Sequence, residues 1–301
     1  MPHPFSNKAG KQLLASLRKI FQEKPIFHRK YKFIVFVCGG TLDAEQDSLR
    51  KQFLAWADTN LPEFICLLAE DALKDNFVGE GRKFINLGMF ESIVAEVSDC
   101  VLIFPESAGS FAETGFFAYS KIREKTLVVN PLDFQAVESF LNLGPIDTIN
   151  AHSFLRATIH ITTQEPEDFG HVAQRLKERV KWPQQRERLP YQRYGQFNFK
   201  QKLLVVFELI RLLRLADLKT LRHALIACFD GSPKYDELRH ILRILIAAGF
   251  IERDGDYFKA KGGLSLVEIE HLEIEKVLAQ VNLFYQTYAH DLYEALPGVS
   301  P

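Results

Sequence analysis

Short apolar runs alternate with longer amphipathic stretches through the first half of the chain. The apolar runs end at polar residues, proline or glycine, and they lie at 33–38, 64–68, 101–104 and 126–129, with 157–161 as a candidate fifth. Runs that are apolar throughout are typical of strands in a parallel sheet covered on both faces. Between them, apolar side chains recur at helical spacing in 48–58, 84–97 and 111–121. This order predicts an α/β domain with a doubly wound, Rossmann-like parallel sheet.

The rest of the 301-residue chain predicts a second, smaller domain and two flanking segments. Residues 1–32 carry one apolar stripe, so we expect a basic amphipathic N-terminal helix, a pattern also found in mitochondrial presequences. The α/β domain covers 33–165, and a helix with a polar, proline-containing linker follows at 166–196. Residues 197–301 then form the second domain.

The second domain begins with three predicted helices, at 200–213, 218–228 and 235–248. A β-hairpin with an Asp-Gly-Asp turn follows over 250–260. Three helices followed by a hairpin resemble a winged helix-turn-helix. Together with Lys234, which precedes it, the third helix has a net charge of only +1, and its apolar residues are needed for packing. We therefore expect docking by shape onto a nucleic acid or a protein rather than readout of bases.

Composition places the chain among globular proteins of the cytoplasm. Hydrophobic residues make up 47% and charged residues 25%, and no apolar run approaches the roughly 18 residues of a membrane span. No signal-peptide core is present at the start. The four cysteines and nine histidines are scattered, so we expect neither disulfides nor a metal site, and no cofactor is indicated.

Two segments are strongly basic although the whole chain has a net charge of −1. Residues 1–32 hold eight basic residues against one acidic residue, and 175–193 hold seven against two. Such patches favour a polyanionic partner, because basic side chains release counterions from phosphates, although a solvated surface is an equal alternative. The candidate nucleic-acid contacts are Lys11, Arg18, Lys19, Arg186 and Arg188.

The segment 104–115 carries the clearest chemical pattern, because it runs from the third strand into a helix. Ligands of open parallel sheets bind beyond the carboxyl ends of the strands, where this loop lies. Gly109 permits close approach of the backbone, Ser110 adds a hydroxyl, and the helix start can hold an anion. We expect Glu113 in the first helical turn, facing the ligand. The alternative is that residues 110–113 form an S-x-x-E capping box, in which Glu113 only caps its own helix.

These residues resemble the glycosidic-bond loops of two enzyme families. Pro105, Gly109, Ser110 and Glu113 look like the P-x-x-x-G-[ST]-x-x-E loop of the cytokinin-activating phosphoribohydrolases. Glu113 followed by Gly115 is similar to the E-x-G at the nucleophile of the nucleoside deoxyribosyltransferases. The resemblance implies a deoxyribosyltransferase-like fold and cleavage of an N-glycosidic bond with Glu113.

The first strand ends in Gly39 and Gly40, where both families have a nucleotide-binding turn. Taken with the basic start and the winged helix, the chain resembles deoxyribosyltransferase-like effectors encoded beside a retron reverse transcriptase. That resemblance implies a toxin of antiphage defence, whose partners are the reverse transcriptase and its RNA-linked single-stranded DNA. Alternatives are a housekeeping deoxyribosyltransferase or phosphoribohydrolase, and a nucleotide-sensing regulator that binds nucleic acid. A homo-oligomer is also open.

The loop departs from both families. Glu106 and Ser107 stand where the phosphoribohydrolases have two glycines, and Glu106 is the nearest candidate for the second carboxylate of the deoxyribosyltransferases. Asp71 follows the second strand and could orient a ribose hydroxyl or act as an acid, or Glu70 and Asp71 could cap the next helix. The expected substrate-binding residues are Gly39, Gly40, Asp71, Glu106, Ser107, Gly109 and Ser110.

An incomplete second carboxylate favours a substrate that needs no proton donor. Cleavage builds positive charge at the anomeric carbon, which Glu113 can stabilise or capture. The nicotinamide of NAD leaves without protonation, so we expect NAD or a related nucleotide as the substrate.

Overall fold

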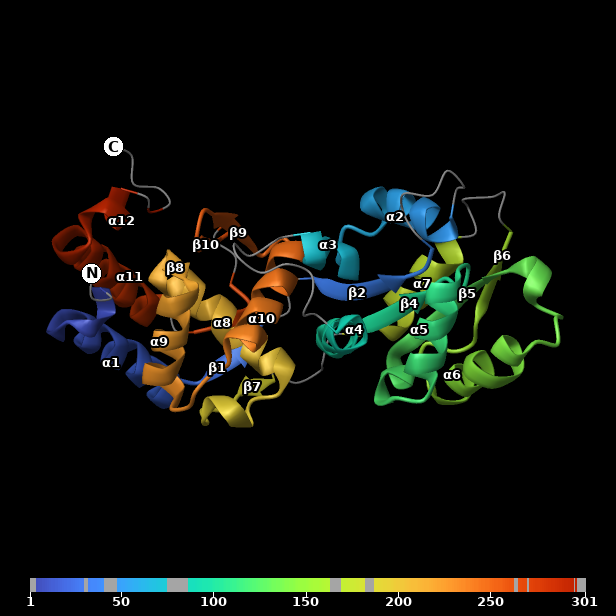
Figure 1. Cartoon of the computed structure of the whole chain (residues 1–301), viewed down its shortest axis with the longest axis horizontal. Helices are drawn as coiled ribbons and strands as arrows, with labels where there is room; N and C mark the ends of the chain where they lie inside the picture. Colours follow the sequence, from blue (N-terminus) through green and yellow to red (C-terminus); the bar gives the residue numbers. More distant parts are fainter. Residues whose placement is uncertain are drawn as a thin grey trace. The chain divides into compact units, whose positions relative to one another are not determined.

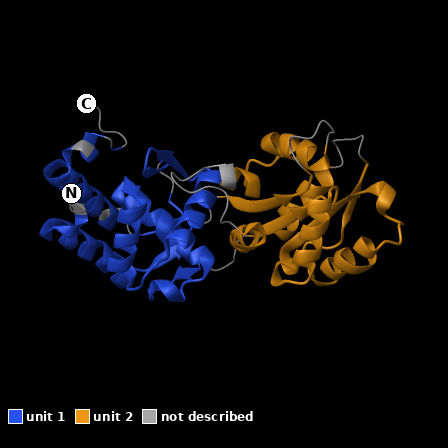
Figure 2. Ribbon diagram, viewed as in Figure 1, with its two compact units in different colours: residues 1–31, 75–81, 183–301 blue, residues 32–74, 82–182 orange. Residues whose placement is uncertain are grey.

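The computed structural model describes residues 4–29, 32–40, 48–74, 86–162, 169–181, 187–262, 265–269, 271–294 and 296. They divide into two compact units, drawn in different colours in Figure 2. The described residues of 32–74 and 82–182 form the first, which we call the sheet unit. Those of 1–31 and 183–301 form the second, the helical unit.

The sheet unit contains a five-stranded parallel sheet in the order β3-β2-β4-β5-β6 (Figure 1). Its strands are β2 (Phe33–Cys38), β3 (Phe64–Leu67), β4 (Cys100–Ile103), β5 (Thr126–Pro131) and β6 (Ile159–Ile161). All four ladders are parallel. The prediction of an α/β unit with a parallel sheet is confirmed, and all five expected strands are present within a few residues.

Helices cover both faces of this sheet, as the fully apolar strands require. The helices are α2 (Leu49–Asn60), α3 (Ala69–Lys74), α4 (Leu87–Val97), α5 (Ala108–Ala118), α6 (Asp147–His152) and α7 (Phe169–Arg179). On one face α2 and α7 pack together, with the rings of Phe53 and Phe169 5.6 Å apart. On the other face Phe117 of α5 packs edge-on against Phe36 of β2. Shorter helical turns are η3 (Lys121–Lys125), η4 (Leu132–Phe134) and η5 (Asn142–Ile146).

Three helices of the sheet unit differ from the sequence prediction. Helix α5 begins at Ala108 instead of residue 111, because the Ser107 side chain caps it three residues earlier than expected. Residues 69–74 and 147–152 form α3 and α6, which the prediction did not include. Both are six residues long, too short to show a helical period in sequence.

The helical unit contains the three expected helices, here α8 (Phe199–Leu213), α9 (Leu218–Phe229) and α10 (Tyr235–Ala247). The hairpin that follows consists of β9 (Ile251–Asp254) and β10 (Tyr257–Ala260), and β8 (Ala216–Asp217) completes a three-stranded antiparallel sheet. Gly255 has a φ of +59° in the hairpin turn, a conformation that glycine adopts without strain.

The chain start packs in this helical unit. Helix α1 (Lys8–Glu23) follows the turn η1 (Pro4–Ser6) and buries its apolar stripe against α9 and α11 (His271–Tyr288). Phe21 of α1 lies 4.8 Å from Phe229 of α9. Strand β1 (Ile26–His28) pairs with β7 (Arg188–Leu189) and β11 (Val267–Glu268) in a second antiparallel sheet. The remaining elements are η7 (Tyr194–Gln196) and α12 (His290–Glu294).

Candidate active site

The centre of the candidate site is the point where the helices after β2 and β4 leave the sheet toward opposite faces. These strands are neighbours, yet α2 covers one face and α5 the other. Such a switch point opens a crevice at the carboxyl ends of the strands, where ligands of open α/β sheets bind. The helix that follows each strand also begins at this edge, so first-turn side chains of several helices meet there.

The start of α5 is held by its own side chains. Ser107 Oγ accepts the backbone N–H of Ser110, and Ser110 Oγ accepts the N–H groups of Glu106 and Ser107. The capping box therefore consists of Ser107 and Ser110, with Gly109 inside the first turn. The alternative box over residues 110–113 is wrong, and Glu113 lies in the second turn rather than the first. Ser110 is 1% exposed and its hydroxyl is bonded within the loop, and its expected substrate contact stays a prediction.

Glu106 joins this loop to the first turn of α2. Its Oε1 accepts the N–H of Gly40 at 3.0 Å and of Arg50 at 3.1 Å, and its Oε2 accepts that of Leu49 at 2.8 Å. Three charge-assisted bonds to backbone donors use both oxygens of the carboxylate. The structure thus places Glu106 as a clamp between two loops, whereas its expected substrate contact stays a prediction.

The glycine pair after β2 makes room for Arg50. A Cβ atom on Gly39 would lie 2.8 Å from side-chain carbons of Arg50, closer than packing permits. Arg50 is 3% exposed, donates to the Gly40 carbonyl at 3.1 Å and forms a two-point ion pair with Glu70 at 2.6 and 2.8 Å. A buried guanidinium is therefore fixed at the switch point, next to the expected substrate-binding turn.

Glu113 extends from α5 toward this cation with an incomplete set of bonds. Its Oε2 is buried and has no hydrogen-bond partner in the described part of the chain. Burial raises the pKa of Glu113, the charge of Arg50 opposes that rise, and the charge of Glu70 adds to it. The nearby thiol of Cys38, buried at the end of β2, acts to lower the pKa of Glu113, and burial raises the pKa of the thiol itself. A buried oxygen left unbonded is unusual and marks a place for a ligand atom.

A second carboxyl group in this cluster comes from α4. Burial, followed by the charges of Glu113 and Glu70, raises the pKa of Glu91 to about 7. Glu91, Arg50 and Cys38 were not among the site residues expected from the sequence. The available signal for Glu91 was an acidic residue near the start of a helix whose other residues are mostly apolar.

Asp71 occupies the first turn of α3 beside Glu70. Acidic side chains there complement the positive end of the helix dipole. This position is compatible with the alternative that Glu70 and Asp71 cap the helix. It is Glu70, however, that pairs with Arg50. The expected role of Asp71 in substrate binding stays a prediction.

The expected nucleic-acid residues lie in the helical unit and differ in their bonding. Lys11 and Lys19 are exposed on α1, and Lys19 lies 3.8 Å from Glu23. Arg18 instead donates to both carboxylate oxygens of Asp230, at 2.8 and 2.6 Å, and to a backbone carbonyl of α9. Arg188 is exposed on β7, and Arg186 lies outside the described residues.

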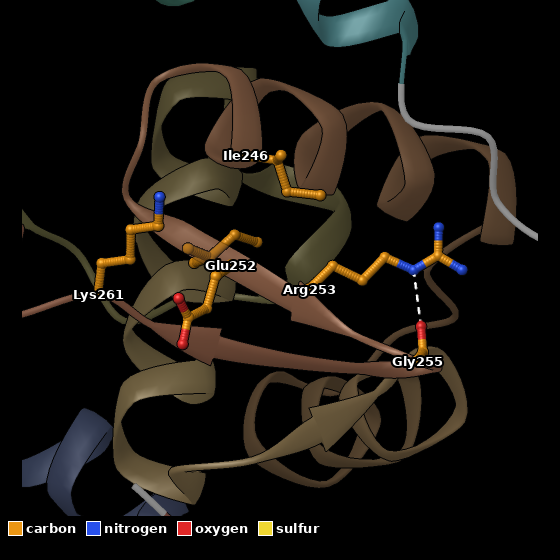
Figure 3. A pocket seen from close by; sticks show the side chains of 6 residues that line it. Ile246, Glu252, Arg253, Gly255 and Lys261 are labelled. Carbon is orange, nitrogen blue, oxygen red and sulfur yellow. Dashed lines mark hydrogen bonds between the residues drawn. The ribbon is translucent and has the colours of Figure 1, made fainter.

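A hollow of about 490 Å³ lies between α10 and the β9–β10 hairpin (Figure 3). Ile246 faces it from α10, and Glu252, Arg253 and Lys261 surround it from the hairpin side. Arg253 Nε donates to the Gly255 carbonyl at 2.8 Å, which ties its guanidinium to the turn. None of the buried, unbonded side-chain atoms of the described chain lines this hollow, so the sheet unit holds the better candidate for chemistry.

Two features of the described residues bear on the class of site. No group of three or more His, Cys, Asp or Glu side chains among them could hold a metal ion. None of the described helices has the length and apolar character needed to cross a membrane.

Comparison with known proteins gives related chains. Over 187 residues the chain is 30% identical to an Escherichia coli protein named retron Ec86 putative ribosyltransferase/DNA-binding protein, covering 59% of this chain and 57% of that protein. Over 124 residues it is 34% identical to the Escherichia coli retron Ec73 putative ribosyltransferase/DNA-binding protein, covering 40% and 39%. The alignments thus span about half the length of these relatives or less.

A family model described as STM3845 retron effector protein matches residues 46–253, which is more than half of the chain. The match includes Arg50, Glu70, Glu91 and Glu113 and also reaches α8, α9 and α10 of the helical unit. On this basis the chain belongs to the STM3845 retron effector protein family.

Proposed function

We propose that the sheet unit cleaves the N-glycosidic bond of a nucleoside or nucleotide and that Glu113 acts at the anomeric carbon. The observation that carries this proposal is the buried, unbonded Oε2 of Glu113 at the switch point of the sheet. Cleavage needs a carboxylate that meets positive charge developing on the sugar. Arg50 favours the ionised form of Glu113 despite its burial. The names of the two relatives, which include ribosyltransferase, support the same reaction class.

Glu91 is the proposed proton donor. With a pKa of about 7, it is protonated in a substantial fraction of molecules at neutral pH, while Glu113 supplies the negative charge. The C–N bond breaks, its electron pair goes to the base nitrogen, and the base takes the proton of Glu91. Glu113 shields or captures the anomeric carbon. Water or an acceptor hydroxyl then adds there and returns a proton to Glu91.

This assignment changes the argument about the substrate. NAD was favoured because a second carboxylate was not evident near the loop, and a cationic leaving group needs no acid. Glu91 supplies that carboxyl group from α4. Neutral purine and pyrimidine leaving groups are therefore served as well as nicotinamide, and NAD is one member of the substrate class to be tested.

Membership of a retron effector family favours the effector role over a housekeeping transferase or a nucleotide-sensing regulator. We infer that the chain is a toxin held in check by a reverse transcriptase and its RNA-linked single-stranded DNA. The exposed Lys11 and Lys19 of α1 and Arg188 of β7 are the proposed phosphate contacts. The names of the relatives, which include DNA-binding, support a nucleic-acid partner.

The helical unit supports docking by shape. Its α8–α10 helices and β9–β10 hairpin resemble a winged helix-turn-helix. Most charged side chains of α10, however, are paired or buried. Arg239 bonds to Asp236, Glu237 pairs with Lys202, and Arg243 is 6% exposed. Few charged side chains of α10 are available for base edges, so we propose backbone or protein contacts for this helix.

The test is release of free base by the full chain, freed from inhibitory partners, from NAD and a panel of nucleosides and nucleotides. We expect Glu113→Gln to lower the rate at least about 10²-fold, because it removes the charge that faces the anomeric carbon. Wild-type protein that cleaves none of these compounds would contradict the proposed activity. Equal rates for the two proteins would leave Glu113 without a catalytic role.

A further inference from the structure

The sheet unit contains a second candidate site, an apolar pocket of about 660 Å³. Its walls are the loop before α5, the first turns of α5, the end of β5 and the segment 134–145. This volume lies within the range of roughly 300–1,000 Å³ that small-molecule sites occupy. Phe111 and Ala112 line the pocket, whereas Glu113 does not, so the pocket is separate from the carboxylate cluster.

One of the polar side chains in this largely apolar wall is buried. Asn130 lies at the carboxyl end of β5, lines the pocket and is 2% exposed. No hydrogen bond of its side-chain amide to a described residue is present. A buried amide without a partner lowers stability unless a ligand or water bonds to it. Its place in the pocket therefore points to a ligand with a complementary polar edge.

The other polar residues of the pocket already have partners. Asn142 Nδ2 donates to the carbonyls of Phe134 and Val137, at 2.9 and 2.8 Å. Ser139 Oγ accepts the backbone N–H of Asn142 at 3.2 Å. These bonds fix the segment that forms one wall, whereas the buried amide of Asn130 takes part in none of them.

Three exposed phenylalanine side chains line the pocket. Phe140 is 84% exposed, Phe134 51% and Phe111 45%, so a planar ligand can reach their rings. An asparagine amide presents a donor and an acceptor in one plane, which matches N6 and N7 of adenine. Unpaired bases are commonly held by aromatic stacking together with hydrogen bonds to their edges.

We propose that this pocket binds a purine base, with the adenine edge bonded to Asn130 and its face stacked on the phenylalanine rings. The proposal does not rest on the glycosidase activity. The base can come from a free nucleoside or from single-stranded nucleic acid, since both present the same edge and face.

The test is calorimetric titration of the full-length Glu113→Gln protein, chosen to slow the proposed cleavage of adenosine, with adenosine, cytidine and a short oligo-dA strand. We expect adenosine or oligo-dA to bind, and the tighter of the two identifies the source of the base. Asn130→Leu, which keeps the size but removes the amide, should weaken that binding at least about tenfold. Phe140→Ala, at a highly exposed position, should weaken it about fivefold or more and leave the melting temperature nearly unchanged.

Three results would overturn the proposal. One is the absence of adenosine and oligo-dA binding, and another is cytidine binding as tight as adenosine binding. The third is self-association that Phe140→Ala abolishes and adenosine does not affect, measured by sedimentation, since the pocket would then be a contact between two copies. Loss of base release with retained adenosine binding would separate failure of the glycosidase proposal from failure of this one.

Discussion

Two glutamates of one loop–helix segment, Glu106 before α5 and Glu113 in its second turn, have opposite environments. Glu106 accepts three backbone N–H groups at 2.8–3.1 Å and joins two loops. Glu113 is half-buried, its buried Oε2 is unbonded among the described residues, and burial raises its pKa. A carboxylate with a complete set of donors stabilises the fold, whereas one left incomplete can accept a bond from a ligand. The bonding, rather than the residue type, separates the structural glutamate from the candidate catalytic one.

The largest effect is expected when each glutamate is replaced by glutamine and the rates of base release are compared. We expect Glu113→Gln to lose at least about 10²-fold in rate of base release while its melting temperature changes little. Glu106→Gln should retain most of its activity per folded molecule. Parallel rate measurements and melting curves check both variants. A large loss of stability in Glu113→Gln with unchanged activity would make Glu113 the structural glutamate instead of the catalytic one.

The pH dependence of base release tests whether Glu91 is the proton donor. Protonated Glu91 donates to the leaving base, so the rate should fall about tenfold per pH unit above its pKa of about 7. On the acid side the rate should fall as Glu113 becomes protonated. Glu91→Gln should remove the alkaline limb and lower the maximum rate. A pH–rate profile whose alkaline limb survives in Glu91→Gln would assign the proton donor elsewhere.

Stability should depend on pH through the same group. The folded pKa of Glu91 lies above its unfolded value of about 4.3, so its contribution to stability is greatest below that pH and is lost as pH rises through about 7. We expect Glu91→Gln to melt at a higher temperature relative to wild type at pH 8 than at pH 5. A melting difference that is the same at both values would contradict the raised pKa.

Loss of the bonds that Glu106 makes should lower mainly the stability of the fold. Glu106→Gln keeps one acceptor oxygen but places an amide group against a backbone N–H, so we expect the free energy of unfolding to fall by about 1–3 kcal/mol. Chemical denaturation measures the change. Lys51→Gln, at an exposed position in the same turn of α2, is the matched control and should have little effect.

The smallest effects are expected for the basic residues of α1. There the exposed Lys11 and Lys19 can be compared with Arg18, which is paired with Asp230. Lys11→Glu with Lys19→Glu should weaken binding to single-stranded DNA and reduce the log–log salt slope by about one unit per lost phosphate contact. Arg18→Gln, which breaks a paired contact to Asp230, should leave that slope unchanged. Equal slope changes for the two proteins would show that pairing with Asp230 does not exclude Arg18 from nucleic-acid contact.

Local patterns in the sequence predicted the parallel sheet, the three helices and hairpin of the helical unit, and the loop that carries Glu113. The start of α5 was misplaced, because residues 107–110 and 110–113 both resemble a cap, and only the bonds of Ser107 and Ser110 distinguish them. The short α3 and α6 gave no period to detect.

The sequence by itself determined where the strands lie and which loop leaves the sheet with a glutamate, because these features depend on neighbouring residues. Only the tertiary structure decided that Arg50, Glu70 and Glu91 join Glu113, since they follow different strands or precede β4. Parallel strands bring their carboxyl ends to one edge, where the first turns of separate helices meet. The same assembly filled the bonds of Glu106 and left one oxygen of Glu113 without a partner among the described residues.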